Sequence, residues 1–263
     1  MLTFKKYITE AAQQGFQYEN NAAAALKPYD VVPKSFVPAG AGSDIPDLMI
    51  KLPGSSKQAG CELKITAASA GSLVMKWDPK AGWSIGKEGE TDDEKLFIIE
   101  LAKEVGIIDQ LNKQWKNEPY KFTKNQKVLD EIKDLDKRSK YTAERERFPE
   151  MKGNIPATKI EDYYNKKKTY YVNVGTNGFY LLGTQNPLKL NNVPRFGTAA
   201  KAGYRARVQS KGGGSYQFTF EMSFSIPRSK NSPHNIAPTV GKTVSINSEK
   251  MMETLKGLFN VNI

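Results

Sequence analysis

Two short apolar segments separated by turn-forming residues constrain the fold of this chain most strongly. Residues 47–52 and 61–66 have the length and composition of strands, and residues 53–57 between them are rich in Pro, Gly and Ser. Side chains alternate between the two faces of a strand, so Glu62 and Lys64 are predicted to point to the same side and Leu63 to the other. The pattern therefore predicts that Asp47, Glu62 and Lys64 converge at one point of a sheet.

Such a cluster needs a binding partner to explain it. Two carboxylates and an amine are costly to remove from water unless they are paired or hold an ion. Mg²⁺ suits the position because it prefers oxygen ligands and is usually held by one or two carboxylates, waters and substrate phosphate. The alternative is a surface hairpin that carries an exposed Glu–Lys pair.

The remaining pattern predicts an α+β fold. Helical spacing is expected in four segments, residues 3–26, 92–105, 107–115 and 248–259. Further strands are expected at residues 73–77, 83–85, 170–174, 179–182, 204–209 and 216–226. Residues 121–147 are expected to form solvated helices, and residues 150–165 a hinge or a short helix. The prediction is an α/β part with a helical insertion at 1–150, followed by a mostly antiparallel β part at 151–263.

The charge of the chain is distributed unevenly. The 263 residues carry a net charge of +11. Residues 151–263 hold 16 Lys and Arg against 5 Asp and Glu, whereas residues 1–150 hold 23 of each sign. This asymmetry predicts a polyanionic partner, with DNA the leading candidate; the alternative is a basic surface that only keeps the protein dissolved.

Several classes of protein are disfavoured by the composition. With one cysteine, Cys61, and one histidine, His234, neither a disulfide framework nor a zinc site of several Cys and His residues is expected. No apolar run has the length of a transmembrane helix, and the N-terminus lacks the pattern of a secretory signal. A cytoplasmic protein without membrane contact is therefore predicted.

Pro46-Asp47 and Glu62-Leu63-Lys64 together resemble the motif of the PD-(D/E)XK nuclease superfamily, which has the restriction-endonuclease-like fold. The resemblance covers about the first 80 residues, and the Gly-rich turn before Pro46 is similar to that of phage-encoded members. It implies that Asp47 and Glu62 ligate Mg²⁺, with Mn²⁺ as a substitute, and that Lys64 orients or activates the attacking water. Many members add a glutamate from the preceding helix. Glu19 is the best match to it and Glu10 the second.

The chemistry of phosphodiester cleavage agrees with those roles. A cation polarises the phosphoryl oxygen and lowers the pKa of a bound water, and a nearby lysine stabilises the added negative charge of the transition state. Six further residues are predicted to contact nucleic acid: Arg205, Arg207, Lys201, Lys211, Lys76 and Ser72. The aromatic residues that alternate in the C-terminal strands are expected to be mostly core.

The leading hypothesis is thus a Mg²⁺-dependent DNA endonuclease, with a homodimer plausible for cutting both strands. One alternative is a DNA- or RNA-binding protein without catalysis, in which Asp47, Glu62 and Lys64 form a structural ion pair. Another is a phage structural or assembly protein with a basic surface.

Overall fold

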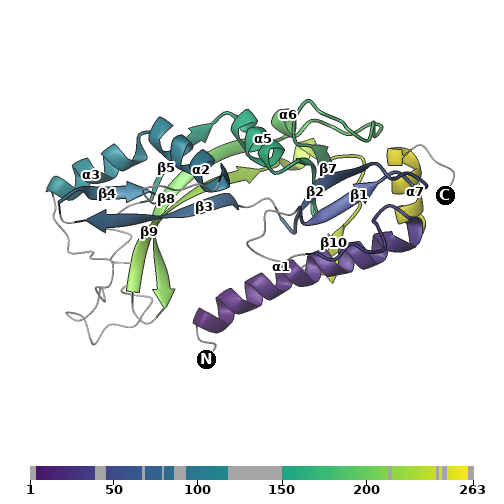
Figure 1. Cartoon of the computed structure of the whole chain (residues 1–263), viewed down its shortest axis with the longest axis horizontal. Coiled ribbons are helices and arrows are strands. Elements are labelled where there is room, and N and C mark those ends of the chain that lie inside the picture. The colour runs from purple at the N-terminus through teal and green to yellow at the C-terminus, as the bar shows by residue number, and fades with distance from the viewer. Residues whose placement is uncertain are drawn as a thin grey trace. The chain divides into compact units, whose positions relative to one another are not determined.

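The computed structural model of the chain forms two compact units, each built from several segments (Figure 1). It describes residues 4–38, 46–66, 69–78, 80–85, 93–117, 150–212, 215–240, 243–244 and 248–259. Unit 1 comprises Met1–Ala68, Pro156–Lys201 and Phe224–Ile263. Unit 2 comprises Ser69–Ile155 and Ala202–Ser223.

Unit 1 is built around a mixed sheet of four strands in the order β1-β2-β6-β7. The strands are β1 (Leu48–Lys51), β2 (Gln58–Lys64), β6 (Thr169–Val174) and β7 (Gly178–Leu181). The pairs β1–β2 and β6–β7 are antiparallel, whereas β2 and β6 are parallel. A parallel pair needs a long crossover, and here the chain passes through unit 2 and α5 between the two strands.

Helices complete unit 1. They are α1 (Phe4–Leu26), α5 (Ala157–Lys166), α6 (Phe196–Ala199) and α7 (Ser248–Phe259). Two 3-10 turns lie at Lys27–Tyr29 and Arg228–Lys230. The short strands β10 (Thr239–Val240) and β11 (Thr243–Val244) pair antiparallel. Helix α1 buries Tyr18, Ala22 and Leu26, which lie on one face because they are spaced four residues apart. These residues share a core with Leu63 of β2. Pro28 follows directly and cannot continue an α-helix.

Unit 2 contains a five-stranded sheet in the order β4-β3-β9-β8-β5. The strands are β3 (Ser69–Asp78), β4 (Gly82–Ile85), β5 (Met151–Ile155), β8 (Lys201–Gly212) and β9 (Ser215–Ser225). The described pairings of β3 with β4, β3 with β9 and β5 with β8 are antiparallel. Helices α2 (Asp93–Glu104) and α3 (Ile107–Asn117) pack against β3 and β4.

Helices and sheets occur together, as the α+β prediction requires, and the predicted strands and helices within the described residues are present. Two local differences stand out. Residues 151–155 form strand β5 instead of a hinge, because they pair with β8 from residue 202 to residue 206. A glycine weakens a helix interior, yet α1 continues without a break through Gly15. The predicted solvated helices at 121–147 lie outside the described residues.

The compact units do not follow the expected boundary at residue 150. Strands β6 and β7 come from the C-terminal part of the chain but join the sheet of β1 and β2, and β5, β8 and β9 join β3 and β4. The positive charge is divided accordingly. Unit 1 holds 19 Lys and Arg against 10 Asp and Glu, and unit 2 holds 20 against 18, so +9 of the net +11 belongs to unit 1.

Candidate active site

The pairing of β1 with β2 brings the first two predicted residues together. The described register ends with Leu48 opposite Cys61, and Asp47 directly precedes Leu48. Glu62 follows Cys61 on β2, and each of the two carboxyl groups affects the pKa of the other. The pairing of β1 with β2 therefore brings the two groups close together.

Lys64 joins this pair from the same strand as Glu62. Its Nζ lies 2.5 Å from Oε1 of Glu62, and the Glu62 side chain is only 7% exposed. The intervening Leu63 is buried in the core on the opposite face, as strand alternation predicts. Although burial opposes both charges, this ion pair holds the pKa of Glu62 below and that of Lys64 well above their ordinary values.

Asp47 is held in place by the backbone of β2 and carries a proton at neutral pH. Its Oδ2 accepts a hydrogen bond from the Leu63 N–H at 2.9 Å. Burial, followed by repulsion from Glu62, raises the pKa of Asp47 to about 8. The neighbouring Asp47 carboxyl group in turn helps to lower the pKa of Glu62, after the larger effect of Lys64.

Glu19 of α1 is the third acidic group of the site. Burial raises its pKa to about 7, while the charge of Lys64 acts in the opposite direction. Its Oε2 atom is buried and has no hydrogen-bond partner among the described residues. The adjacent Tyr18 fixes this part of α1, since its hydroxyl donates to the Ala237 carbonyl at 2.7 Å. Glu10 lies on α1, but its side chain is outside the described part of the structure.

Helix α5 adds residues that the sequence did not single out for the site. Tyr164 is fully buried and interacts electrostatically with Lys64, and Lys167 at the end of the helix acts in the same way on Glu62. The one signal in the sequence for this segment is the run of three lysines at 166–168.

The oxygen donors of this cluster suit a hard cation such as Mg²⁺. Among the residues that the structure describes, no three His, Cys, Asp or Glu side chains form a ready-made metal site. The Glu62 carboxylate already binds Lys64, and Asp47 is protonated. Two carboxylates can still hold Mg²⁺ when water and substrate phosphate supply the remaining ligands, and the buried, unpartnered oxygen of Glu19 fits a nearby positive charge.

The two arginines predicted to contact nucleic acid lie in unit 2 and are already paired. Arg205 donates to both carboxylate oxygens of Glu221, at 2.8 and 3.0 Å, and Arg207 lies 3.5 Å from the same group. Glu221 is 8% exposed in its side chain, and Glu150 lies 3.8 Å from Arg205. Much of the charge of these arginines is therefore offset within the sheet.

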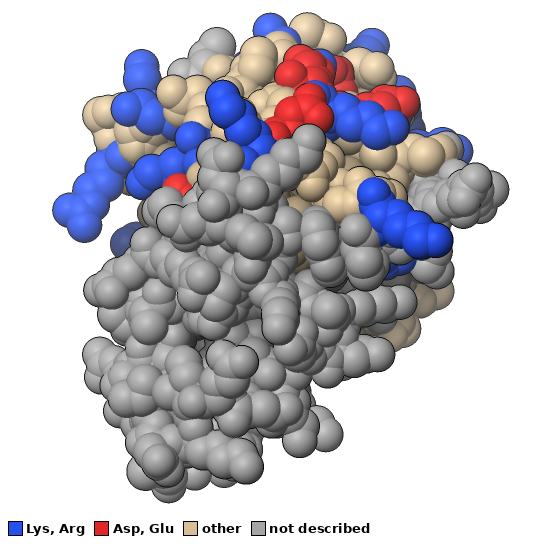
Figure 2. Space-filling view, turned by 90° about the vertical axis from the view of Figure 1, so that its left-hand side faces the viewer, with Lys and Arg blue, Asp and Glu red and all other residues tan. Residues whose placement is uncertain are grey.

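The other predicted contacts are dispersed. Ser72 is exposed on β3 opposite Glu221, and Lys76 is half-buried on the same strand opposite Ser84 of β4. Lys201 is exposed at the start of β8, and the side chain of Lys211 lies outside the described residues. Figure 2 views the molecule from the left-hand side of Figure 1. On the described part of this side, Lys and Arg side chains are spread around a small group of acidic ones.

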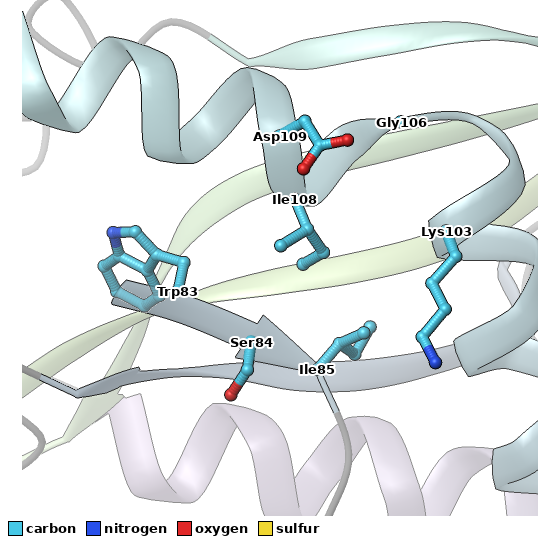
Figure 3. Close-up of a pocket in the computed structure, with 7 residues that line it drawn as sticks. All are labelled: Trp83, Ser84, Ile85, Lys103, Gly106, Ile108 and Asp109. Carbon is cyan, nitrogen blue, oxygen red and sulfur yellow. The ribbon is translucent and has the colours of Figure 1, made fainter. Parts of the chain in front are cut away.

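A pocket of about 360 Å³ lies in unit 2, between β4 and the segment that joins α2 to α3 (Figure 3). Its lining residues are Trp83, Ser84, Ile85, Lys103, Gly106, Ile108 and Asp109. Asn112 of α3 fixes β4 here, because its side chain hydrogen-bonds both the N–H and the carbonyl of Trp83. None of the residues predicted for catalysis lines this pocket.

Comparison with protein-family models, curated proteins and solved structures finds no match to this chain. Within the described residues, no helix has the length and apolar character needed to span a membrane. The geometry of the site is therefore the basis for assigning a function.

Proposed function

We propose that this protein is a Mg²⁺-dependent nuclease that hydrolyses phosphodiester bonds of DNA. The proposal rests chiefly on one observation: Asp47 accepts a hydrogen bond from the Leu63 N–H of β2, next to Glu62, and Lys64 is ion-paired to Glu62 on the same strand. A restriction-endonuclease-like core is part of the proposal. In its support, β2 and β6 are parallel and α5 directly precedes β6 in sequence.

Each residue has a distinct role in this proposal. Asp47 and Glu62 hold the cation, and Glu19 contributes its unpartnered carboxylate oxygen through water or directly. Bound there, Mg²⁺ would polarise the phosphoryl oxygen and lower the pKa of the attacking water. Lys64 orients that water and stabilises the negative charge that develops on the phosphate. Glu62 fixes the ammonium group of Lys64 for this task.

The charge of unit 1 supports a polyanionic substrate. This unit contains the whole acidic cluster and also carries a net charge of +9. Catalytic carboxylates and phosphate-attracting lysines thus belong to one compact unit. Arg205 and Arg207 of unit 2 are weaker candidates for DNA contacts because Glu221 neutralises part of their charge.

Cleavage of linear and supercoiled DNA by purified variants tests the proposal. Asp47→Asn and Lys64→Met should each lower the Mg²⁺-dependent cleavage rate by about 100-fold or more, the usual effect of removing a group that stabilises developing charge. The matched controls are Asp162→Asn and Lys57→Met, since both residues are exposed in unit 1. The controls should cleave at the wild-type rate.

A second measurement separates loss of chemistry from loss of folding. Mg²⁺ should raise the melting temperature of the wild-type protein and of Asp162→Asn but not that of Asp47→Asn, because a ligand stabilises only the form that binds it. Both site variants should keep their affinity for DNA within a few-fold.

A DNA- or RNA-binding protein without catalysis is the second candidate. The observation in its favour is the direct contact between Lys64 and Glu62, which would be a structural ion pair. Wild-type protein that binds DNA, shows no thermal response to Mg²⁺ or Mn²⁺ and cleaves nothing would favour this candidate over the nuclease.

A further inference from the structure

Lys167 lies at the end of α5, where the chain turns into β6. Its N–H donates to the Tyr164 carbonyl at 3.0 Å, and the following residue, Lys168, has a left-handed backbone with φ of 53°. The left-handed Lys168 ends the helix and turns the chain into β6. Residues 166 and 168 are exposed, whereas Lys167 is half-buried.

Two aromatic rings hold the Lys167 ammonium group. Its Nζ lies 5.5 Å from the ring centroid of Tyr163 and 5.9 Å from that of Tyr164. Contacts of this kind are worth about 0.5–1 kcal/mol at exposed sites and more when water is excluded. The two rings therefore favour one region for this positive charge, next to the C-terminal end of α5.

The same turn packs against the strand that carries the site. A Cβ atom on Gly60 of β2 would lie 2.8 Å from the Lys168 carbonyl oxygen, so the backbones are in direct contact there. Glu62 lies two residues further along β2, and its partner in the register is Val172 of β6, the strand into which this turn leads. Lys167 thus provides a positive charge at the start of the strand pair that carries Glu62 and Lys64.

The charges of the site leave a role for this second lysine. With a divalent cation bound and the three carboxyl groups ionised, the charges of these groups, the cation and the Lys64 ammonium add up to zero. An arriving phosphodiester therefore adds one uncompensated negative charge. A lysine is well suited to hold a phosphate as a compact point charge.

We infer that Lys167 binds a backbone phosphate of the nucleic acid beside the acidic cluster. This inference rests on the proposed function, because it names a substrate contact of the same site. Lys167 is a binding residue in this scheme, and Lys64 remains the lysine at the reacting phosphate.

The experiment compares Lys167→Met with Lys166→Met, which removes an equal charge from the neighbouring exposed residue. Methionine keeps an apolar side chain over the two tyrosine rings. Affinity for a labelled DNA duplex is measured over a range of salt concentrations, with Ca²⁺ in place of Mg²⁺ to prevent turnover. Lys167→Met should bind about tenfold more weakly and lower the slope of log K against log[salt] by about one unit.

Three further results complete the test. The DNA affinity of Lys166→Met should stay within about twofold of wild type, and Lys167→Arg should retain most of the wild-type affinity. In Mg²⁺, the effect of Lys167→Met should appear mainly in KM.

Equal DNA binding by Lys167→Met and Lys166→Met, with wild-type cleavage intact, would overturn the inference and leave the nuclease proposal standing. Wild-type binding without cleavage, together with the Lys167→Met defect, would instead reject the nuclease and keep Lys167 as a phosphate contact. Absence of DNA binding by the wild type would reject both.

Discussion

Asp47 keeps its proton at neutral pH when no cation is bound, because burial and then the nearby charge of Glu62 raise its pKa. The proton resides on Asp47, whose pKa is raised to about 8, since Lys64 stabilises the charge of Glu62. Cation binding must displace that proton, so folding, protonation and metal binding are linked at this site.

The stability of the metal-free protein should fall as pH rises from about 4 to 8. In this range the unfolded Asp47 is ionised while the folded one keeps its proton, so the folded state binds more protons and loses stability with rising pH. Glu19, with a pKa of about 7, adds to this effect up to neutral pH. At pH 8, Asp47→Asn should therefore be more stable than wild type, by about 1–3 kcal/mol.

Urea denaturation at pH 5, 6, 7 and 8 in the presence of a chelator measures this effect. Asp162→Asn is the control, because Asp162 is exposed on α5 and its substitution should leave the wild-type pH profile unchanged. Parallel profiles for wild type and Asp47→Asn would show that Asp47 is ionised in the folded protein.

At the scale of elements, Gly60 lets three segments approach one another. A Cβ at this position would lie 2.5 Å from the Pro46 side chain and 2.8 Å from the Lys168 carbonyl oxygen. The pairing of β2 with β6 also shifts its register between Gly60 and Cys61. The absence of a side chain at Gly60 therefore positions both the residue before Asp47 and the turn that carries Lys167.

Gly60→Ala should destabilise the protein by about 1–3 kcal/mol and lower the cleavage rate, because overpacking must displace Pro46 or the 167–168 turn. The control is Gly15→Ala in α1, where an added Cβ meets nothing within 4 Å. That substitution should stabilise the protein by about 0.5–1 kcal/mol, since alanine is the better helix former. Urea midpoints of the two variants should move in opposite directions; a Gly60→Ala midpoint at or above that of wild type would refute the packing argument.

For the molecule as a whole, the net charge of +11 predicts salt-sensitive binding to DNA. Release of counterions from each neutralised phosphate makes affinity fall with salt, and several contacts together should cost at least about a hundredfold between 50 and 200 mM salt. Fluorescence anisotropy with a labelled duplex measures this dependence. A protein whose basic residues only keep it dissolved would show no such binding at either concentration.

Much of the local structure could be predicted from the sequence. Apolar periodicity located α1, α7 and the strands of both sheets except β5, and it placed Glu62 and Lys64 on one face with Leu63 on the other. These features depend on residues close together in the chain, where spacing alone fixes which face a side chain occupies.

The arrangement of those elements was decided by tertiary structure. The charge pattern suggested two parts divided at residue 150. Instead, β2 pairs with β6 across about 110 residues and β3 pairs with β9 across about 150 residues, so each sheet joins strands from both sides of that boundary. Arg205 and Arg207 looked available from their spacing, but Glu221 on the next strand pairs with both.

The sequence by itself determined the elements, the faces of each strand and the excess of positive charge. Only the tertiary structure decided that Asp47 lies close to Glu62, that Glu19 of α1 reaches the same site and that the turn at residues 167–168 packs against β2. The physical reason is that strand register and the packing of helices on a sheet depend on contacts between distant segments, which local spacing does not encode.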